Sequence, residues 1–248
     1  MTFHDHFSTA AGGYALSRPT YPEALFRHLA ELAPGRESAW DCATGNGQAA
    51  HGLARYFGCV EATDASAEQI AHAAPLANVS YSVQPAESTA FPAASFDALC
   101  VAQALHWFDV ERFYAEAKRV LKPRAVVLVV GYGWMEISPG IDGALKRAVI
   151  DPLGPFWPQQ NRLLWNEYRD LPFPFERIEF PAMAIEARWT LAQLVAYIGT
   201  WTATRRLLEA KPDFLEGVHA ALAAAWGPPE ARVVRSPLTI TCGRHAGS

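Results

Sequence analysis

Short apolar runs alternate with helical patterns over the first half of the chain, and this alternation limits the fold more than any other feature. The apolar runs predict strands at residues 38–43, 59–63, 79–83, 96–102 and 125–130. Between the last two runs, Asp109 is expected to cap a helix whose apolar residues lie on one face. Strands that alternate with helices are typical of βαβ units. The sequence therefore predicts an α/β fold with a mostly parallel sheet and helices on both faces.

The second half of the chain is patterned differently. Residues 152–174 are rich in Pro, Trp and Phe and are expected to form an inserted cap. Further strands are expected at 177–183 and 233–242, with Pro237 at an edge or bulged position, and helices from Thr190 to Trp201 and over about 213–226. We expect one domain, 1–248, with seven strands, a terminal antiparallel pair, an N-terminal lid at about 1–34 and an inserted cap at about 134–175.

The bulk composition excludes several classes of function. The chain of 248 residues has 25 Asp and Glu against 21 Lys and Arg, so no nucleic-acid partner is expected. No apolar stretch reaches about 18 residues, which argues against a membrane partner. The four cysteines form no CxxC pair, so no metal is expected and the thiols are expected to be free. No signal peptide is indicated, which favours a cytoplasmic protein, and no oligomeric state is predicted.

A turn after the first predicted strand has the residues of a nucleotide site. Asp41 ends the strand, Gly45 and Gly47 lie in the turn, and a helix follows. Glycines let the backbone approach a ligand closely, and the helix presents free N–H groups. In open α/β sheets the ligand lies beyond the carboxyl ends of the strands, where this turn is expected. A Gly-x-Gly turn by itself is as often a structural connection.

Three further segments follow the next predicted strands in order. Asp64 ends the second strand and could accept hydrogen bonds from ribose hydroxyls, or could be a helix N-terminal acid. Ala86 and Glu87 follow the third strand, where they could contact an adenine, although Glu87 alone is more typical of a solvated loop. Residues 103–108 place polar and aromatic side chains after the fourth strand. The conjunction of these segments favours a nucleotide-type cofactor.

The same segments resemble those of the class I methyltransferases of the methyltransferase-11 type. The resemblance is carried by the sequences Trp-Asp-Cys-Ala-Thr-Gly-Asn-Gly-Gln (40–48), Ala-Thr-Asp-Ala-Ser (62–66), Pro-Ala-Glu-Ser-Thr-Ala-Phe-Pro (85–92) and Gln-Ala-Leu-His-Trp-Phe (103–108). The last of these, with residues 14–22 and 197–205, is most similar to the branch that contains trans-aconitate 3-methyltransferase and its yeast relatives. The resemblance implies a Rossmann-like fold, S-adenosyl-L-methionine as cofactor and a small-molecule methyl acceptor.

The resemblance also implies a role for individual residues. Those implied for cofactor binding are Asp41, Ala43, Gly45 and Gly47 at the methionine moiety, Asp64 at the ribose, Ala86 and Glu87 at the adenine, Gln103 near the donor methyl, and Tyr14 and Arg18 folding over the cofactor. Ala43 departs from the family pattern, which has Gly there. Pro85 replaces an acid that many relatives carry.

The acceptor is less constrained than the cofactor. A carboxylate is already ionised at pH 7 and needs no general base. A phenol, amine or carbon acceptor could need one, and His106 is the candidate catalytic residue, although a packed histidine beside Trp107 is the more common case. The acceptor pocket is expected from the N-terminal segment, residues 106–108, Trp134 and residues 156–165. Arg205 and Arg206 could bind an acidic substrate.

Two other functions remain open from the sequence. The first is an NAD-dependent oxidoreductase with a related fold, against which Ala50 stands in the third glycine place of the dinucleotide fingerprint. The second is a non-catalytic module that binds the cofactor without turnover.

Overall fold

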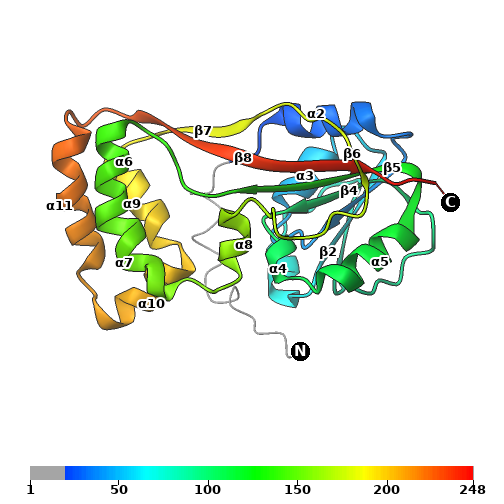
Figure 1. Cartoon of the computed structure of the whole chain (residues 1–248), viewed down its shortest axis with the longest axis horizontal. Helices are drawn as coiled ribbons and strands as arrows, with labels where there is room; N and C mark the ends of the chain where they lie inside the picture. The colour runs from blue at the N-terminus through cyan, green and yellow to red at the C-terminus, as the bar shows by residue number, and fades with distance from the viewer. Residues whose placement is uncertain (1–19, 248) are drawn as a thin grey trace. The chain divides into compact units, whose positions relative to one another are not determined.

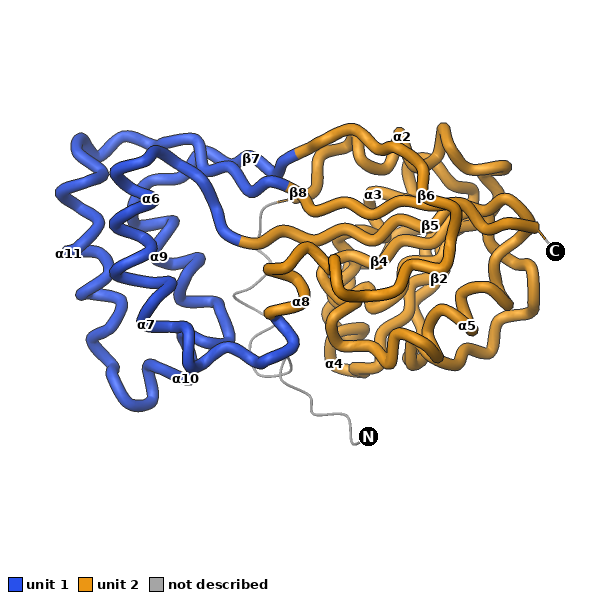
Figure 2. The backbone as a smooth tube through the Cα atoms, viewed as in Figure 1, with its two compact units in different colours: residues 1–19, 134–161, 184–237 blue, residues 20–133, 162–183, 238–248 orange. Residues whose placement is uncertain are grey.

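The structure is a computed structural model that describes residues 20–247. Its backbone divides into two compact units (Figure 2). The sheet unit contains 20–133, 162–183 and the residues from 238 onward, and the helical unit contains 134–161 and 184–237. The chain predicted as a single domain with an inserted cap thus contains two compact units. Of the predicted cap, residues up to 161 belong to the helical unit and the rest to the sheet unit.

The sheet unit has the strand order β3-β2-β1-β4-β5-β8-β6 (Figure 1). The strands are β1 (Ser38–Cys42), β2 (Cys59–Asp64), β3 (Val79–Val83), β4 (Phe96–Ala102), β5 (Leu121–Tyr132), β6 (Glu176–Arg177) and β8 (Arg232–Arg244). Neighbours among β1 to β5 are parallel, and β8 is antiparallel to β5 and β6. This arrangement confirms the predicted Rossmann-like α/β fold with a terminal antiparallel pair, and it brings the carboxyl ends of β1, β2 and β4 to one edge. The described sheet has eight strands instead of the predicted seven, because a further strand, β7 (Ala184–Trp189), also pairs with β8.

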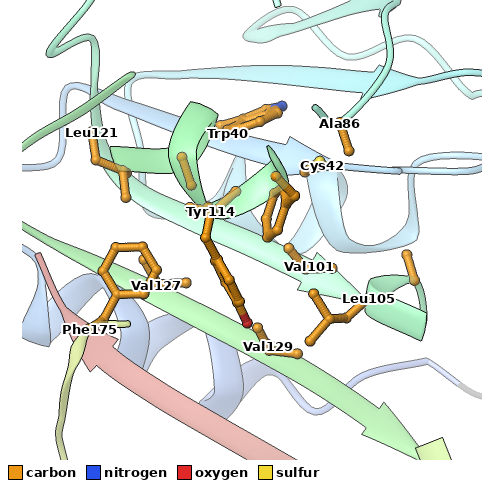
Figure 3. Packing of buried hydrophobic residues seen from close by; sticks show 14 of the residues in the cluster. Trp40, Cys42, Ala86, Val101, Leu105, Tyr114, Leu121, Val127, Val129 and Phe175 are labelled. Carbon is orange, nitrogen blue, oxygen red and sulfur yellow. The ribbon is translucent and has the colours of Figure 1, made fainter. Parts of the chain in front are cut away.

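Buried side chains cover both faces of this sheet. Along β4 and β5 successive residues alternate between two hydrophobic clusters, because side chains of a strand point to opposite faces. One cluster, built around Trp40, Tyr114 and Val127, is shown in Figure 3. The helices of the sheet unit are α2 (Glu23–Leu32), α3 (Gln48–Leu53), α4 (Ala67–Ala71), the 3₁₀ turn η2 (Leu105–Trp107), α5 (Val110–Val120) and α8 (Asn161–Trp165), which begins at the end of the helical unit.

Local signals located several helix ends correctly. Asp109 caps α5, and its carboxylate accepts a hydrogen bond from the N–H of Arg112 at 3.3 Å.

The described part of the expected lid forms α2, whose Leu25 and Leu29 are fully buried in the core. The prediction of one strand over 177–183 was wrong, because β6 ends at Arg177 and the next strand is β7 (Ala184–Trp189). Pro181 between them has no N–H to donate to a ladder.

The helical unit packs its helices around a cluster of its own. Its elements are α6 (Pro139–Leu145), the π-helix η3 (Lys146–Ile150), α7 (Asp151–Leu153), the 3₁₀ turn η4 (Gly154–Phe156), α9 (Leu191–Gly199), α10 (Thr202–Ala210) and α11 (Phe214–Trp226). Strand β7 pairs antiparallel with residues 232–237 of β8, so the partner of β8 changes at Pro237. The predicted helix start at Thr190 is confirmed, and Thr190 and Gln193 form a capping box there.

Within residues 20–247, no helix combines the length and the apolar character that crossing a membrane requires.

Candidate functional site

Asp41 lies fully buried at the carboxyl end of β1. Its Oδ2 atom accepts a hydrogen bond from the hydroxyl of Thr44 at 2.5 Å, and the N–H of Thr44 donates to the carbonyl oxygen of Thr63 at 2.8 Å. The other carboxylate atom, Oδ1, is buried and has no hydrogen-bond partner among the described residues. Burial raises the pKa of Asp41 to about 7. A buried acceptor without a partner is suited to a cationic or N–H donor from a ligand.

The turn after Asp41 has a left-handed backbone at three positions. The φ angles are +56° at Ala43, +58° at Gly45 and +92° at Gly47. A Cβ on Gly47 would come within 2.5 Å of the Tyr81 hydroxyl oxygen, so close approach as well as conformation requires glycine there. Ala43 stands where the family pattern has Gly and adopts the conformation that glycine favours.

Asp64 is the last residue of β2 and connects the two strand ends. Its Oδ2 atom accepts a hydrogen bond from the N–H of Gly45 at 2.9 Å, and its Oδ1 atom accepts one from the N–H of Ser66 at 2.8 Å. A carboxylate oxygen has two lone pairs and can accept more than one hydrogen bond. Asp64 can therefore be both an acid at the N-terminus of a helix and a contact to a ligand, the two alternatives that the sequence left open.

Ala86 and Glu87 follow β3. Ala86 is buried in the same cluster as Trp40. The Oε1 atom of Glu87 accepts a hydrogen bond from the N–H of Asp109 at 2.9 Å, so this side chain connects its loop to the start of α5. Sequence patterns gave no indication of this contact, since the two residues are 22 positions apart.

Gln103 connects the carboxyl ends of β4 and β5 through two hydrogen bonds. Its Nε2 atom donates to the carbonyl oxygen of Tyr132 at 3.0 Å, and its Oε1 atom accepts from the N–H of Tyr132 at 3.3 Å. Its φ is +58°, which is uncommon for a residue other than glycine. Strained backbone of this kind is concentrated at functional sites.

His106, in η2, is 5% exposed, and its Nδ1 atom lies 3.0 Å from the hydroxyl oxygen of Tyr168. Burial lowers the pKa of His106 to about 4. Tyr168 is 6% exposed and lies just after α8. Sequence reasoning placed Tyr168 only within the general cap stretch and missed its pairing with His106, which is 62 residues away.

Of the aromatic residues expected at the acceptor pocket, Phe156, Trp134 and Trp157 lie in the helical unit, whereas Trp107, Phe108 and Trp165 lie in the sheet unit. The ring centroids of Trp134 and Trp201 are 6.1 Å apart, and those of Trp157 and Trp201 are 5.7 Å apart. A cavity of about 280 Å³ is lined by Trp134 and Trp201 together with Lys146, Val149 and Ile150 of η3. The cavity is thus built mainly from aromatic and aliphatic side chains.

The two arginines expected to bind an acid also lie in the helical unit. Arg206 donates from Nη1 to the carbonyl oxygen of Phe156 at 3.2 Å, and burial lowers the pKa of Arg205. No described carboxylate forms an ion pair with Arg205. The implied cofactor residues Tyr14 and Arg18 lie outside the described residues. Within the described part of the chain, no three His, Cys, Asp or Glu residues are grouped as metal ligands.

The sheet unit therefore brings most of the predicted cofactor residues to one edge, and their chemistry fits S-adenosylmethionine. The buried Oδ1 of Asp41 suits an ammonium group such as that of the methionine moiety. The left-handed turn from Ala43 to Gly47 would let the backbone approach a ligand closely, and the Asp64 carboxylate lies beside this turn.

Comparison with known proteins gives the same family. A methyltransferase domain model matches residues 40–129. A candidate type II methyltransferase of Anaeromyxobacter dehalogenans is 42% identical, with 93% of this chain and 99% of that chain covered and a TM-score of 0.87. A candidate methyltransferase of Dictyostelium discoideum is 28% identical over 229 residues, 90% of this chain and 87% of the relative.

A more distant solved structure supports the fold alone. A candidate methyltransferase of Bacillus halodurans C-125 is 18% identical, with 90% of this chain and 99% of that chain covered and a TM-score of 0.51. The 42% identity over nearly all of both chains, together with the domain match, decides the family. The chain belongs to the class I S-adenosylmethionine-dependent methyltransferases.

Proposed function

We propose that this enzyme transfers a methyl group from S-adenosylmethionine to a carboxylate oxygen of a small organic acid. Within the family, we place it in the branch that contains trans-aconitate 3-methyltransferase and its yeast relatives. The observation that carries the choice of acceptor is the burial of His106, which is 5% exposed and whose pKa is thereby lowered to about 4. A base this weak removes a proton poorly from a phenol or an ammonium, whereas a carboxylate needs no base at pH 7.

The cofactor residues keep the roles that the family resemblance implies. Asp41 accepts from the amino group of the methionine moiety, with the backbone of Ala43, Gly45 and Gly47 beside it, and Asp64 accepts from the ribose hydroxyls. Ala86 and Glu87 contact the adenine. Gln103 lies near the donor methyl, and Tyr14 and Arg18 fold over the cofactor. Support comes from the buried Oδ1 of Asp41 and from the hydrogen bond between Gly45 and Asp64.

The chemistry requires little from the protein beyond positioning. The cofactor supplies a methyl group activated by a sulfonium. The acceptor carboxylate supplies the electron pair of the new O–C bond, and the electron pair of the broken C–S bond stays on sulfur, so no proton moves. The products are a methyl ester and S-adenosylhomocysteine. Holding the carboxylate in line and excluding water are therefore the tasks of the chain's own residues.

The charge of the protein argues against a nucleic-acid acceptor. The formal net charge is −4, and no basic run provides a phosphate-binding surface. We therefore propose a cytoplasmic enzyme with a small-molecule acceptor and no nucleic-acid partner.

The test is transfer of a labelled methyl group from S-adenosylmethionine to a panel of carboxylic acids, phenols and amines. We expect transfer to carboxylic acids, with base-labile methyl esters as products. Transfer to phenols or amines alone contradicts the proposed acceptor. Tight binding of S-adenosylhomocysteine without transfer to any acceptor favours the non-catalytic alternative, and calorimetric binding of NAD in place of the adenosyl cofactor favours the oxidoreductase.

A further inference from the structure

His106 and Tyr168 form a hydrogen-bonded pair inside the sheet unit. The Tyr168 hydroxyl oxygen and the His106 Nδ1 atom are 3.0 Å apart, and the two rings stack with an interplanar angle of 22°. Both residues are almost completely buried. Among the described residues, the other ring nitrogen of His106, Nε2, has no hydrogen bond. One ring nitrogen is therefore held by the protein, and the other remains available to a ligand.

The hydrogen bond determines which ring nitrogen carries the proton. A neutral imidazole has one N–H donor and one acceptor nitrogen, and burial lowers the pKa of His106 to about 4, so the ring is neutral at pH 7. A phenol has a single O–H donor, and the only described partner of the Tyr168 hydroxyl is Nδ1. If Nδ1 carried the proton, the Tyr168 O–H would be a buried donor without an acceptor, which is costly.

Another buried tyrosine of the same cluster does not change this assignment. The hydroxyl of Tyr114 is buried and has no hydrogen-bond partner among the described residues, so it does not accept from Tyr168. Figure 3 shows the Tyr114 side chain extending toward Val129 and Leu105. The satisfied arrangement is the one in which Tyr168 donates to Nδ1, and it requires the proton of His106 to be on Nε2.

The backbone around Tyr168 is arranged to hold the pair in place. Glu167 and Tyr168 both have φ of +57°, a conformation that is strained for residues with side chains. A Cβ on Gly131 of β5 would come within 2.4 Å of the Leu164 side chain and 3.2 Å of Gln103 Oε1, so glycine permits the segment after Asn161 to lie against the strand ends. Backbone strain of this kind is typical of functional sites.

We propose that His106, held as the Nε2–H tautomer by Tyr168, donates a hydrogen bond to the carboxylate of the methyl acceptor. This rests on the proposed function, because it names the contact that binds and orients the acceptor. His106 is then a substrate-binding donor that keeps its proton, and Tyr168 is a positioning residue. A neutral donor orients the anion without the strong charge pairing by which an imidazolium would weaken it as a nucleophile.

The tautomer can be measured on the whole protein without any methyl transfer. Nitrogen-15 NMR of histidine-labelled protein at pH 7 distinguishes N–H from unprotonated ring nitrogens, and the signals of His106 are assigned by their loss in His106→Gln. We expect a protonated Nε2 and an unprotonated Nδ1. Tyr168→Phe is expected to lose the fixed tautomer and to show a mixture. An Nδ1–H tautomer or an imidazolium in the wild-type protein overturns the proposal.

Tyr114→Phe is the matched control, because it removes the other buried tyrosine hydroxyl of the same cluster. It is expected to leave the His106 signals unchanged. Equal changes in Tyr114→Phe and Tyr168→Phe would mean that the signals report general repacking, and that result also overturns the assignment. Thermal unfolding of each variant shows whether it folds.

The role toward the acceptor is tested with the carboxylic acid that gives the fastest transfer in the panel. His106→Ala is expected to raise the KM for this acid about tenfold or more with a smaller change in kcat, since a hydrogen bond to a charged group is lost. His106→Gln supplies an amide N–H in place of Nε2–H and is expected to remain within about threefold of wild type. An unchanged KM in His106→Ala, or no rescue by Gln, contradicts the contact. The NMR result stands whether or not transfer is found, so failure of the proposed function is distinguishable from failure of this inference.

Discussion

The backbone N–H of Gly45 donates a hydrogen bond to the Oδ2 atom of Asp64 at 2.9 Å. Gly45 lies in the turn after β1, and Asp64 ends β2, so this bond holds together the two strand ends at which the cofactor is proposed to bind. The parallel pairing of β1 with β2 brings the two ends to the same edge, because Cys42 is paired with Thr63. The same carboxylate thus shapes the glycine turn and offers acceptor atoms beside it.

Asp64→Ala is expected to weaken binding of S-adenosylhomocysteine by roughly 1–3 kcal/mol, through loss of charge-assisted hydrogen bonds to the ribose. Isothermal titration calorimetry measures the change. Glu61→Ala is the matched control, because Glu61 is a partly buried carboxylate on the same strand. This substitution should leave the affinity for S-adenosylhomocysteine unchanged. An affinity of Asp64→Ala equal to that of wild type would show that the ribose assignment is wrong.

Cofactor affinity is expected to depend on pH through Asp41. Burial raises the pKa of this carboxyl to about 7 in the free protein, and an ammonium group beside it in the complex favours the ionised form and lowers that pKa. Binding therefore releases a proton below pH 7. The affinity for S-adenosylhomocysteine should rise about tenfold per pH unit from pH 5 toward pH 7 and then become level.

Titration calorimetry across this pH range, in buffers of different ionisation enthalpy, measures both the affinity and the proton released. Asp41→Asn cannot ionise, so its weaker binding should not vary over the same range. A wild-type affinity that is constant from pH 5 to pH 7 would contradict a raised pKa of Asp41 that ligand binding lowers.

Ala43→Gly is expected to stabilise the protein by about 1 kcal/mol, because the φ of +56° is strained for alanine and freely adopted by glycine. Chemical denaturation measures the free energy of unfolding. Ala102→Gly, at the end of β4, is the control and should destabilise by roughly 0.5–1 kcal/mol, as expected for glycine in a strand. Destabilisation by both substitutions to a similar extent would show that the Ala43 backbone is not strained.

Glu116 is expected to stabilise the protein at neutral pH and less so in acid. Its hydrogen bonds from Arg119, and then those from Thr89, lower its pKa from 4.5 to about 2. A carboxyl whose pKa is lower in the folded state contributes stability above pH 4.5, and this contribution is lost as the pH falls toward 2. Because Arg119 is partly exposed and screened by solvent, we expect a contribution of about 2 kcal/mol at pH 6.

The free energy of unfolding of Glu116→Gln, compared with wild type by urea denaturation at pH 6 and pH 3, measures this contribution. The difference should be smaller at pH 3. Glu111→Gln, on the same helix α5, should give little difference at either pH. A difference for Glu116→Gln that grows toward acid pH would contradict the direction of the pKa shift.

The strands and caps of the sheet unit could be predicted because their signals are local. The strands predicted at 79–83 and 96–102 begin and end at the residues found in the structure. Each is marked by an apolar run and a flanking turn only a few residues apart. The helix caps at Asp109 and Thr190 depend on residues three positions apart and were predicted for the same reason. Where a strand depended on distant pairing, as over 177–183, the apolar pattern misled.

The sequence by itself determined the order of segments that makes this chain a class I methyltransferase, since a strand, a glycine turn and a terminal acid are each short-range features. Tertiary structure alone decided which distant groups meet: the Glu87 side chain with the Asp109 backbone, the Gln103 side chain with the Tyr132 backbone, and the His106 and Tyr168 side chains with each other. It also decided the protonation of His106, because burial lowers the pKa of its imidazole to about 4. The physical reason is that folding brings together groups tens of residues apart and removes them from water.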